Sequence, residues 1–188
     1  MKKVGSTFAG MSLSLTLICL VFTGLMATVY DITLEPIAEA GKAKQQNAIK
    51  AVQNDFDEMV TDTVTVDGKA YPVFKTYKAG KWNGTAVEST TNGYGGEIKV
   101  MVGFDNQDNV VDFQVLSHSE TPGLGAKMDQ WFKDPKHTVN RRHLENKTLK
   151  VSKDGGDIDA ITAATITSRA FLNSVNDAYK AYTRTKNN

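Results

Sequence analysis

An uncharged stretch near the start of the chain most constrains where it can fold. No charged residue occurs between Lys3 and Asp31. As a helix, these residues would extend for roughly 40 Å, which exceeds the roughly 30 Å hydrocarbon layer of a bilayer. The sequence therefore predicts a single transmembrane helix over 4–30, preceded by a short N-terminal segment, 1–3.

A cleavable signal peptide is the alternative interpretation of this stretch. Such a peptide has a shorter apolar core, of about 7–15 residues, followed closely by a small-x-small cleavage site. The apolar stretch here is too long, and the candidate site at 38–40 lies well beyond it. We therefore expect an uncleaved anchor.

The charges that flank the span predict its orientation. Lys2 and Lys3 precede it, whereas Asp31 and Glu35 follow it. The positive-inside rule then places the N-terminus in the cytoplasm. We expect a single-pass protein of the cytoplasmic (inner) membrane whose folded part lies on the extracytoplasmic, or periplasmic, side.

The predicted span also carries small and hydroxyl residues, among them Gly10, Ser14, Thr16, Gly24 and Thr28. Small residues allow close packing against other membrane helices, which would indicate partner subunits. The serines and threonines could equally bond to carbonyls of their own helix. The sequence leaves both interpretations open.

Composition excludes several function classes. The chain has 188 residues, of which 22 are basic and 21 acidic, and its net charge is +1. Nucleic acid is therefore not an expected partner, because its recognition requires clustered Lys and Arg. The single cysteine, Cys19, cannot form an intrachain disulfide, and the His, Cys, Asp and Glu residues lack metal-ligand spacing, so no metal site is predicted.

The rest of the chain predicts one α+β domain, an antiparallel sheet with helices. After Pro36, apolar spacing that includes Ile49, Val52, Phe56, Met59 and Val60 indicates an amphipathic helix, so 31–60 is expected to be a juxtamembrane linker and helix, and 61–188 the folded domain. Alternating or β-rich patterns predict strands at 63–66, 71–78, 96–104, 110–116 and 148–151. Helices are expected around Met128 to Phe132 and over 166–183.

Three polar, glycine-bearing or small-residue clusters could hold a ligand. They are Gly-Tyr-Gly-Gly at 93–96, His-Ser-Glu-Thr-Pro-Gly-Leu-Gly at 118–125, and the threonine-rich segment 159–168. The third precedes a predicted helix, whose free N–H groups favour an anion such as phosphate. A Thr or Ser helix cap would satisfy the same groups without a ligand.

Bond-breaking catalysis is not predicted. His118 and Glu120 could form an acid/base pair, but no serine or cysteine nucleophile accompanies them in a hydrolase motif. No nicotinamide fingerprint follows a strand. Local spacing thus favours ligand binding, and no catalytic residue is assigned.

The N-terminal span and the three clusters, taken in this order, resemble those of the G subunit of the Rnf ion-translocating electron-transport complex, a family with a covalent-FMN-binding domain. The resemblance covers essentially the whole chain. It implies that FMN is joined through its phosphate to Thr165, the last residue of a motif that aligns with 162–165. Thr162 and Ala163 depart from the Ser and Gly of that motif. Asp159 matches the acidic position read by a separate flavin transferase, which would be a partner for maturation.

The resemblance also implies a set of flavin-site residues. The ring pocket would comprise Tyr94, Gly95, Gly96, Glu120, Thr121, Gly123, Leu124 and Gly125. Around the phosphate we expect Thr162, Ala163, Ala164, Thr167 and Ser168.

The implied function is that of an electron-carrying flavoprotein subunit within an ion-translocating ferredoxin:NAD⁺ oxidoreductase, with other membrane subunits as partners and no stand-alone activity. Two alternatives remain. One is the C subunit of a sodium-translocating NADH:quinone reductase, which shares the domain. The other is a non-redox, membrane-tethered binding domain that has lost its flavin, for which Ala163 is the main support.

Overall fold

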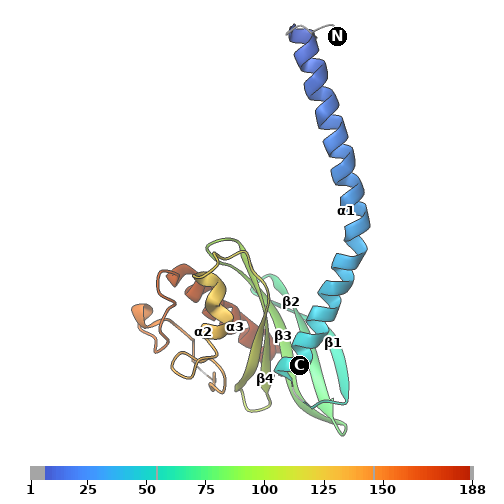
Figure 1. Ribbon diagram of the computed structural model, residues 1–188. Coiled ribbons are helices and arrows are strands. Elements are labelled where there is room, and N and C mark those ends of the chain that lie inside the picture. The colour runs from blue at the N-terminus through green and yellow to red at the C-terminus, as the bar shows by residue number, and fades with distance from the viewer. Residues whose placement is uncertain (1–6, 54, 146, 187–188) are drawn as a thin grey trace. The chain divides into compact units, whose positions relative to one another are not determined.

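The computed structural model describes residues 7–53, 55–145 and 147–186 (Figure 1). It divides into two compact units, Met1–Ala43 and Lys44–Asn188. The first is helical, and the second combines an antiparallel sheet with helices. The predicted α+β class is thereby confirmed.

Helix α1 (Phe8–Val52) is a single α-helix of 45 residues. It is long and apolar enough to cross a membrane. It continues through Pro36, so the segment after residue 30, where a linker was expected, is helical as far as Val52. The hydroxyls of Ser14, Thr16 and Thr28 donate hydrogen bonds to carbonyl oxygens four residues earlier in the same helix, as the second interpretation of these residues predicted.

Five strands form one antiparallel meander in the order β1-β2-β3-β4-β5. They are β1 (Glu58–Val66), β2 (Lys69–Lys78), β3 (Lys81–Asn92), β4 (Glu97–Asp105) and β5 (Val110–Ser117). The first two hairpins turn through pairs in the left-handed region, Asp67-Gly68 and Ala79-Gly80. Such pairs match the twist of the flanking strands.

Several predicted elements differ from the structure. The amphipathic helix ends at Val52, and Met59 and Val60 belong to β1 instead. Strand β3 was not predicted from the sequence. The expected strand at 148–151 is reduced to an isolated bridge between Val151 and Ile158. The expected short helix is α2 (Met128–Trp131), which follows a 3-10 turn, η1 (Gly125–Lys127).

Helix α3 (Thr165–Lys186) covers one face of the sheet. Its buried stripe includes Phe171, Val175, Ala178 and Tyr182, in agreement with the predicted helical face. The Phe171 ring stacks on that of Phe132, with centroids 4.4 Å apart. This core fixes the axis of α3, and with it the position of its N-terminal end. A further 3-10 turn, η2 (Ser152–Asp154), lies in the segment that leads to α3.

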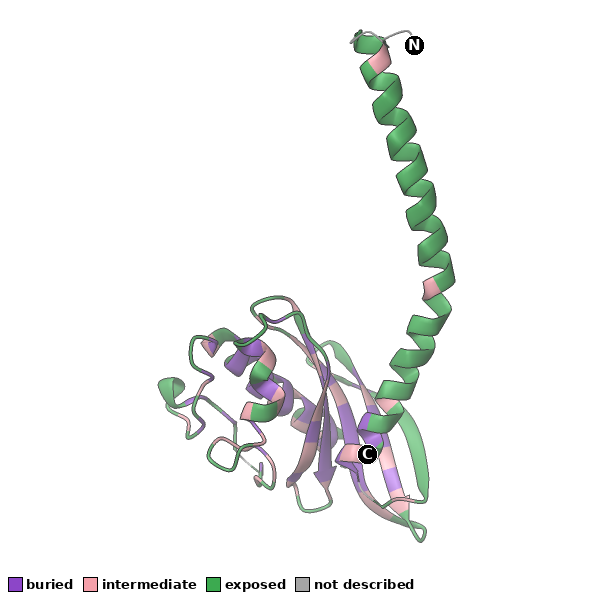
Figure 2. Ribbon diagram, viewed as in Figure 1, coloured by how far each residue is buried: buried purple, intermediate pink, exposed green. Residues whose placement is uncertain are grey.

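The last turns of α1 cover the opposite face, as Figure 2 shows by the buried residues at the end of this helix. Ala48, Ile49 and Val52 pack there in a second apolar cluster. Beyond the helix end, the buried amide of Gln53 donates hydrogen bonds to the carbonyls of Thr85 and Phe104, at 3.1 and 2.8 Å. The helix end is therefore anchored to β3 and β4.

The close approach of α1 to β4 predicts that Gly103 cannot be enlarged. A Cβ atom at this position would lie 2.2 Å from the backbone oxygen of Val52. We expect Gly103→Ala to lower the free energy of unfolding by about 1–3 kcal/mol. Chemical denaturation of the full chain in detergent measures this. Gly41→Ala is the control, because its Cβ would meet no atom within 4 Å; equal stability of Gly103→Ala and the unsubstituted protein would contradict the prediction.

Candidate functional site

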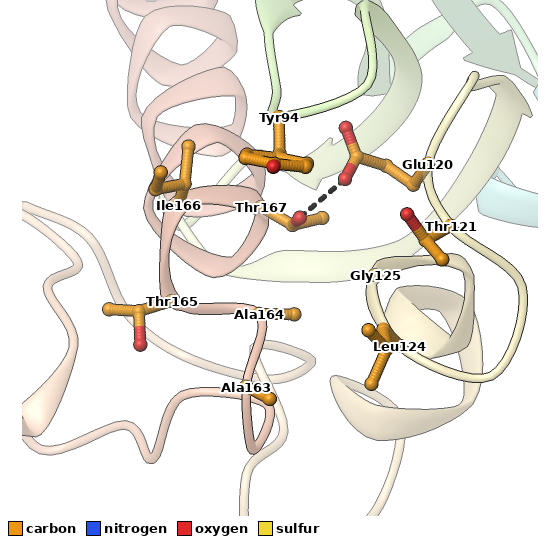
Figure 3. Close-up of a pocket in the computed structure, with 10 residues that line it drawn as sticks. All are labelled: Tyr94, Glu120, Thr121, Leu124, Gly125, Ala163, Ala164, Thr165, Ile166 and Thr167. Atoms are coloured by element: carbon orange, nitrogen blue, oxygen red, sulfur yellow. Dashed lines mark hydrogen bonds between the residues drawn. The ribbon is translucent and has the colours of Figure 1, made fainter.

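The loop after β3, the loop after β5 and the N-terminal end of α3 enclose a cavity of about 450 Å³ (Figure 3). This volume lies within the range typical of small-molecule sites. The lining residues come from all three clusters singled out in the sequence: Tyr94, Glu120, Thr121, Leu124, Gly125, Ala163, Ala164, Thr165, Ile166 and Thr167.

A buried carboxylate connects these three segments. Glu120 is 5% exposed. Its Oε1 accepts a hydrogen bond from the backbone N–H of Gly95 at 2.9 Å, and its Oε2 accepts one from the Thr167 hydroxyl at 2.5 Å. The backbone N–H of Glu120 donates to Nδ1 of His118. Glu120 thus links the loop after β3 to α3, across 25 and 47 residues of sequence.

Glycines leave the space that this carboxylate occupies. A Cβ at Gly93 would lie 2.2 Å from Oε1 of Glu120, and one at Gly125 would lie 2.7 Å from Oε2. A Cβ at Gly95 would meet the backbone oxygen of Ser119 at 2.2 Å. Glycine at 93 and 125 thus leaves room for the Glu120 carboxylate, and glycine at 95 leaves room for the backbone of Ser119.

The wall of the cavity carries large apolar side chains that the protein itself does not cover. Tyr94 is 72% exposed, Leu124 is 40% exposed and Ile166 is 52% exposed. Ile166 was missed from the sequence. The signal for it was available, since Ile166 lies within the threonine-rich segment 159–168, between Thr165 and Thr167.

The threonine-rich segment ends in a turn that leads into α3. The N–H of Ala164 donates to the carbonyl of Ile161, and the buried Ser168 hydroxyl accepts from the N–H of Ile161 and donates to the carbonyl of Ala164. Ser168 therefore stabilises the turn and does not line the cavity. Thr165 is the first residue of α3, where backbone N–H groups lack partners within the helix.

Thr165 also borders a second cavity, of about 400 Å³. In Figure 3 its hydroxyl is directed away from Tyr94 and Glu120. The second cavity is lined by Trp131, His137, Ser152, Lys153, Asp159, Ala160, Ile161, Thr162, Ala163 and Thr165. The Trp131 ring stacks on that of His137, with centroids 4.3 Å apart, and its indole N–H donates to the carbonyl of Asp159. Lys153 is the one lysine or arginine among the described residues that line either cavity.

The structure brings together most of the residues predicted for the site. Nine of them line the first cavity: Tyr94, Glu120, Thr121, Leu124, Gly125, Ala163, Ala164, Thr165 and Thr167. Thr162 lies in the second cavity, and Gly123 borders a third hollow. Gly95 and Gly96 lie in the loop beside the first cavity without lining it. No group of His, Cys, Asp and Glu suited to a metal ion occurs within the part of the chain that the structure describes.

Comparisons with known proteins agree with this geometry. Residues 93–180 match the family described as "FMN-binding domain", and residues 1–52 match "RnfG N-terminal region". The chain is 34% identical to the G subunit of the ion-translocating oxidoreductase complex of Aliivibrio fischeri, over 94% of this chain and 91% of that protein. It is 35% identical to the G subunit of the same complex from Vibrio parahaemolyticus, over 87% of this chain and 83% of that protein.

A solved structure shares the fold. The crystal structure of the C subunit of Na(+)-translocating NADH-quinone reductase from Parabacteroides distasonis superposes with a TM-score of 0.51, covering 80% of this chain and 96% of that chain. The two are 17% identical, so the likeness concerns the fold alone.

The conformation of Ala163 yields a prediction about stability. Its φ is 60°, in the left-handed region, which costs a residue with a Cβ roughly 1–2 kcal/mol. We expect Ala163→Gly to raise the free energy of unfolding by about 1 kcal/mol, because glycine adopts this conformation without the steric penalty. Thermal or chemical denaturation measures the change.

The neighbouring Ala164 supplies the control. It has no positive φ, so Ala164→Gly should destabilise the protein by about 0.5–1 kcal/mol. The same sign of change in both variants would contradict the assignment of backbone strain to Ala163.

Proposed function

This chain belongs to the family of G subunits of ion-translocating oxidoreductase complexes, and we propose that it serves such a complex as an electron carrier with FMN joined covalently to Thr165. One observation carries the proposal. A cavity lined by uncovered apolar side chains has, at its edge, a threonine on the first turn of a long helix. The relatives named as G subunits favour this family over the quinone-reductase alternative.

The residues of the cavity fit a flavin nucleotide. Tyr94, Leu124 and Ile166 offer exposed apolar surface that a flat ring system would cover, and Thr121 and Glu120 add polar groups to the wall. Thr165 stands where the N–H groups of the first turn of α3 and the Lys153 side chain favour a phosphate. Bound FMN would supply reversible electron transfer, while the protein supplies its position and electrostatic surroundings.

Thr165 requires help to become a nucleophile, because a hydroxyl is weakly nucleophilic at neutral pH. In the proposed maturation, its Oγ forms a bond to the FMN-side phosphorus of FAD, the pyrophosphate bond breaks, and AMP leaves. The hydroxyl proton passes to a base of the transferase. Since Thr165 is partly exposed, its hydroxyl is accessible to such an enzyme.

The alternative of a domain that has lost its flavin is disfavoured by the backbone of the attachment loop. Ala163 adopts a left-handed conformation that a glycine would adopt readily, so the substitution leaves the turn in place. The Ala163 methyl group therefore affects the stability of the protein more than the shape of the turn. We further propose that this protein has no stand-alone activity and exchanges electrons only with other subunits.

We also propose the placement of the chain in the membrane. Helix α1 contains the span, the N-terminus is cytoplasmic, and the sheet domain lies on the periplasmic side. The support is the charge asymmetry around the apolar stretch, with Lys2 and Lys3 before it and Asp31 and Glu35 after it. Covalent attachment suits this placement, because a dissociated flavin would be lost from an exported domain.

Substitution at Thr165 tests the attachment. Thr165→Val, similar in shape but without a hydroxyl, should carry no covalent FMN, whereas Thr165→Ser should retain some because it keeps a hydroxyl. The measurement is peptide mass spectrometry with in-gel flavin fluorescence on full-length protein co-expressed with a flavin transferase. Thr121→Val is the matched control, since it removes a hydroxyl from the same cavity outside the motif, and it should keep the adduct. An adduct that persists in Thr165→Val would rule out this attachment residue.

Protease accessibility tests the orientation. Protease added to cells with a permeabilised outer membrane should digest the domain after residue 44, because the positive-inside rule places it outside the inner membrane. A cytoplasmic marker protein should stay intact in the same sample. Digestion that begins only after lysis of the inner membrane would show the opposite orientation.

A further inference from the structure

Glu120 is a buried acid in the wall of the cavity. Its side chain is 5% exposed, and among the described residues no lysine, arginine or histidine lies within ion-pair distance of it. Its two hydrogen-bond donors are the neutral groups of Gly95 and Thr167. Attachment of a ligand at Thr165 does not require this acid, so its presence calls for another role.

We propose that Glu120 is a positioning residue that also acts as a fixed negative charge, and that it lowers the reduction potential of FMN held in this cavity. The inference rests on the proposed function and adds to it a residue that sets the driving force for electron transfer. It concerns the wall of the cavity and not the attachment to Thr165.

Hydrogen bonds from two neutral groups hold the Glu120 carboxylate in the cavity wall. Its Oε1 accepts from the Gly95 N–H at 2.9 Å, and its Oε2 accepts from the Thr167 hydroxyl at 2.5 Å. A Cβ atom at Gly93 or Gly125 would lie 2.2 or 2.7 Å from one of these oxygens, so glycine at both positions leaves the space that the carboxylate occupies.

A fixed charge at this place opposes reduction. A flavin held here would gain negative charge on reduction, and the Glu120 carboxylate would repel that charge more strongly in a partly buried cavity than in water. The described residues that line this cavity include no other acid and no lysine or arginine to offset it. The potential of the bound group should therefore be lower with Glu120 than without it.

The same hydrogen bonds give Glu120 its positioning role. Through the N–H of Gly95 it holds the loop that carries Tyr94, and through Thr167 it fixes that loop against α3. Tyr94 and Ile166 both border the cavity. Removing the whole side chain should thus loosen the Tyr94 loop, whereas removing only the charge should not.

The test is the midpoint potential of the covalently loaded full-length protein, titrated with dithionite and reference dyes. In Glu120→Gln the amide oxygen can still accept from Gly95, and the amide N–H₂ can donate to the Thr167 oxygen, so the charge is removed while the connection stays. We expect the equilibrium constant for one-electron reduction to rise at least tenfold, a shift of about 59 mV toward positive potential. Glu97→Gln, an exposed acid outside the cavity, should leave the potential unchanged.

A second variant separates charge from structure. Thr167→Val keeps the carboxylate and removes one hydrogen bond, so its equilibrium constant for one-electron reduction should stay within tenfold of the unsubstituted value. In the protein without flavin, hydrogen exchange at the Gly95 amide should be faster in Glu120→Ala and nearly unchanged in Glu120→Gln. This second readout does not depend on the loaded protein.

Several outcomes would overturn the inference. They are an unchanged or lower potential in Glu120→Gln, equal shifts in Glu120→Gln and Thr167→Val, or a folded Glu120→Gln protein that takes up no FMN. Absence of the adduct from the unsubstituted protein, seen by intact mass, would instead contradict the proposed function and this inference with it.

Discussion

The sheet has two apolar faces, and both must be covered for the domain to fold. Helix α3 covers one face, where Phe113, Phe132 and Phe171 form a cluster of rings. The last turns of α1 cover the other through Ala48, Ile49 and Val52. Because the sheet is a simple meander, its two covering helices come from the two ends of the folded part. The packing of α3 in turn places its N-terminal end, with Thr165, beside the loops that follow β3 and β5.

The cavity then depends on a polar interaction within this apolar frame. A buried carboxylate is costly unless its oxygens accept hydrogen bonds, and Glu120 meets this requirement with donors from two distant segments. Glycines at 93 and 125 leave the space that this carboxylate occupies. The loops are therefore held in one geometry by hydrogen bonds, while the apolar side chains of Tyr94, Leu124 and Ile166 stay available to a ligand.

Features with a local cause could be predicted from the sequence. The absence of charge over 4–30 indicated the apolar helix, and apolar spacing indicated the buried face of α3. Strand β3 was missed because it is rich in Thr, Ser and Asn, and its burial depends on partners in other strands: the Thr76 hydroxyl of β2, for example, donates to the carbonyl of Gly84. The helix predicted across Met59 and Val60 was wrong because their spacing also suits an edge strand, which pairs with β2.

The same distinction applies to the candidate site. Its three clusters were recognisable as motifs, but the roles of individual residues depended on contacts across the fold. The Ser168 hydroxyl, expected near a phosphate, instead bonds to Ile161 and Ala164 within the turn. The Gly95 N–H donates to the buried Glu120 carboxylate. Two constraints consequently act on a group bound at Thr165. The aromatic core holds the helix that would carry the attachment, and Glu120 holds the loop that would contact the ring. Since these constraints use different residues, attachment and positioning can be lost separately, and a protein that keeps its flavin is not thereby shown to hold it in the geometry needed for electron transfer.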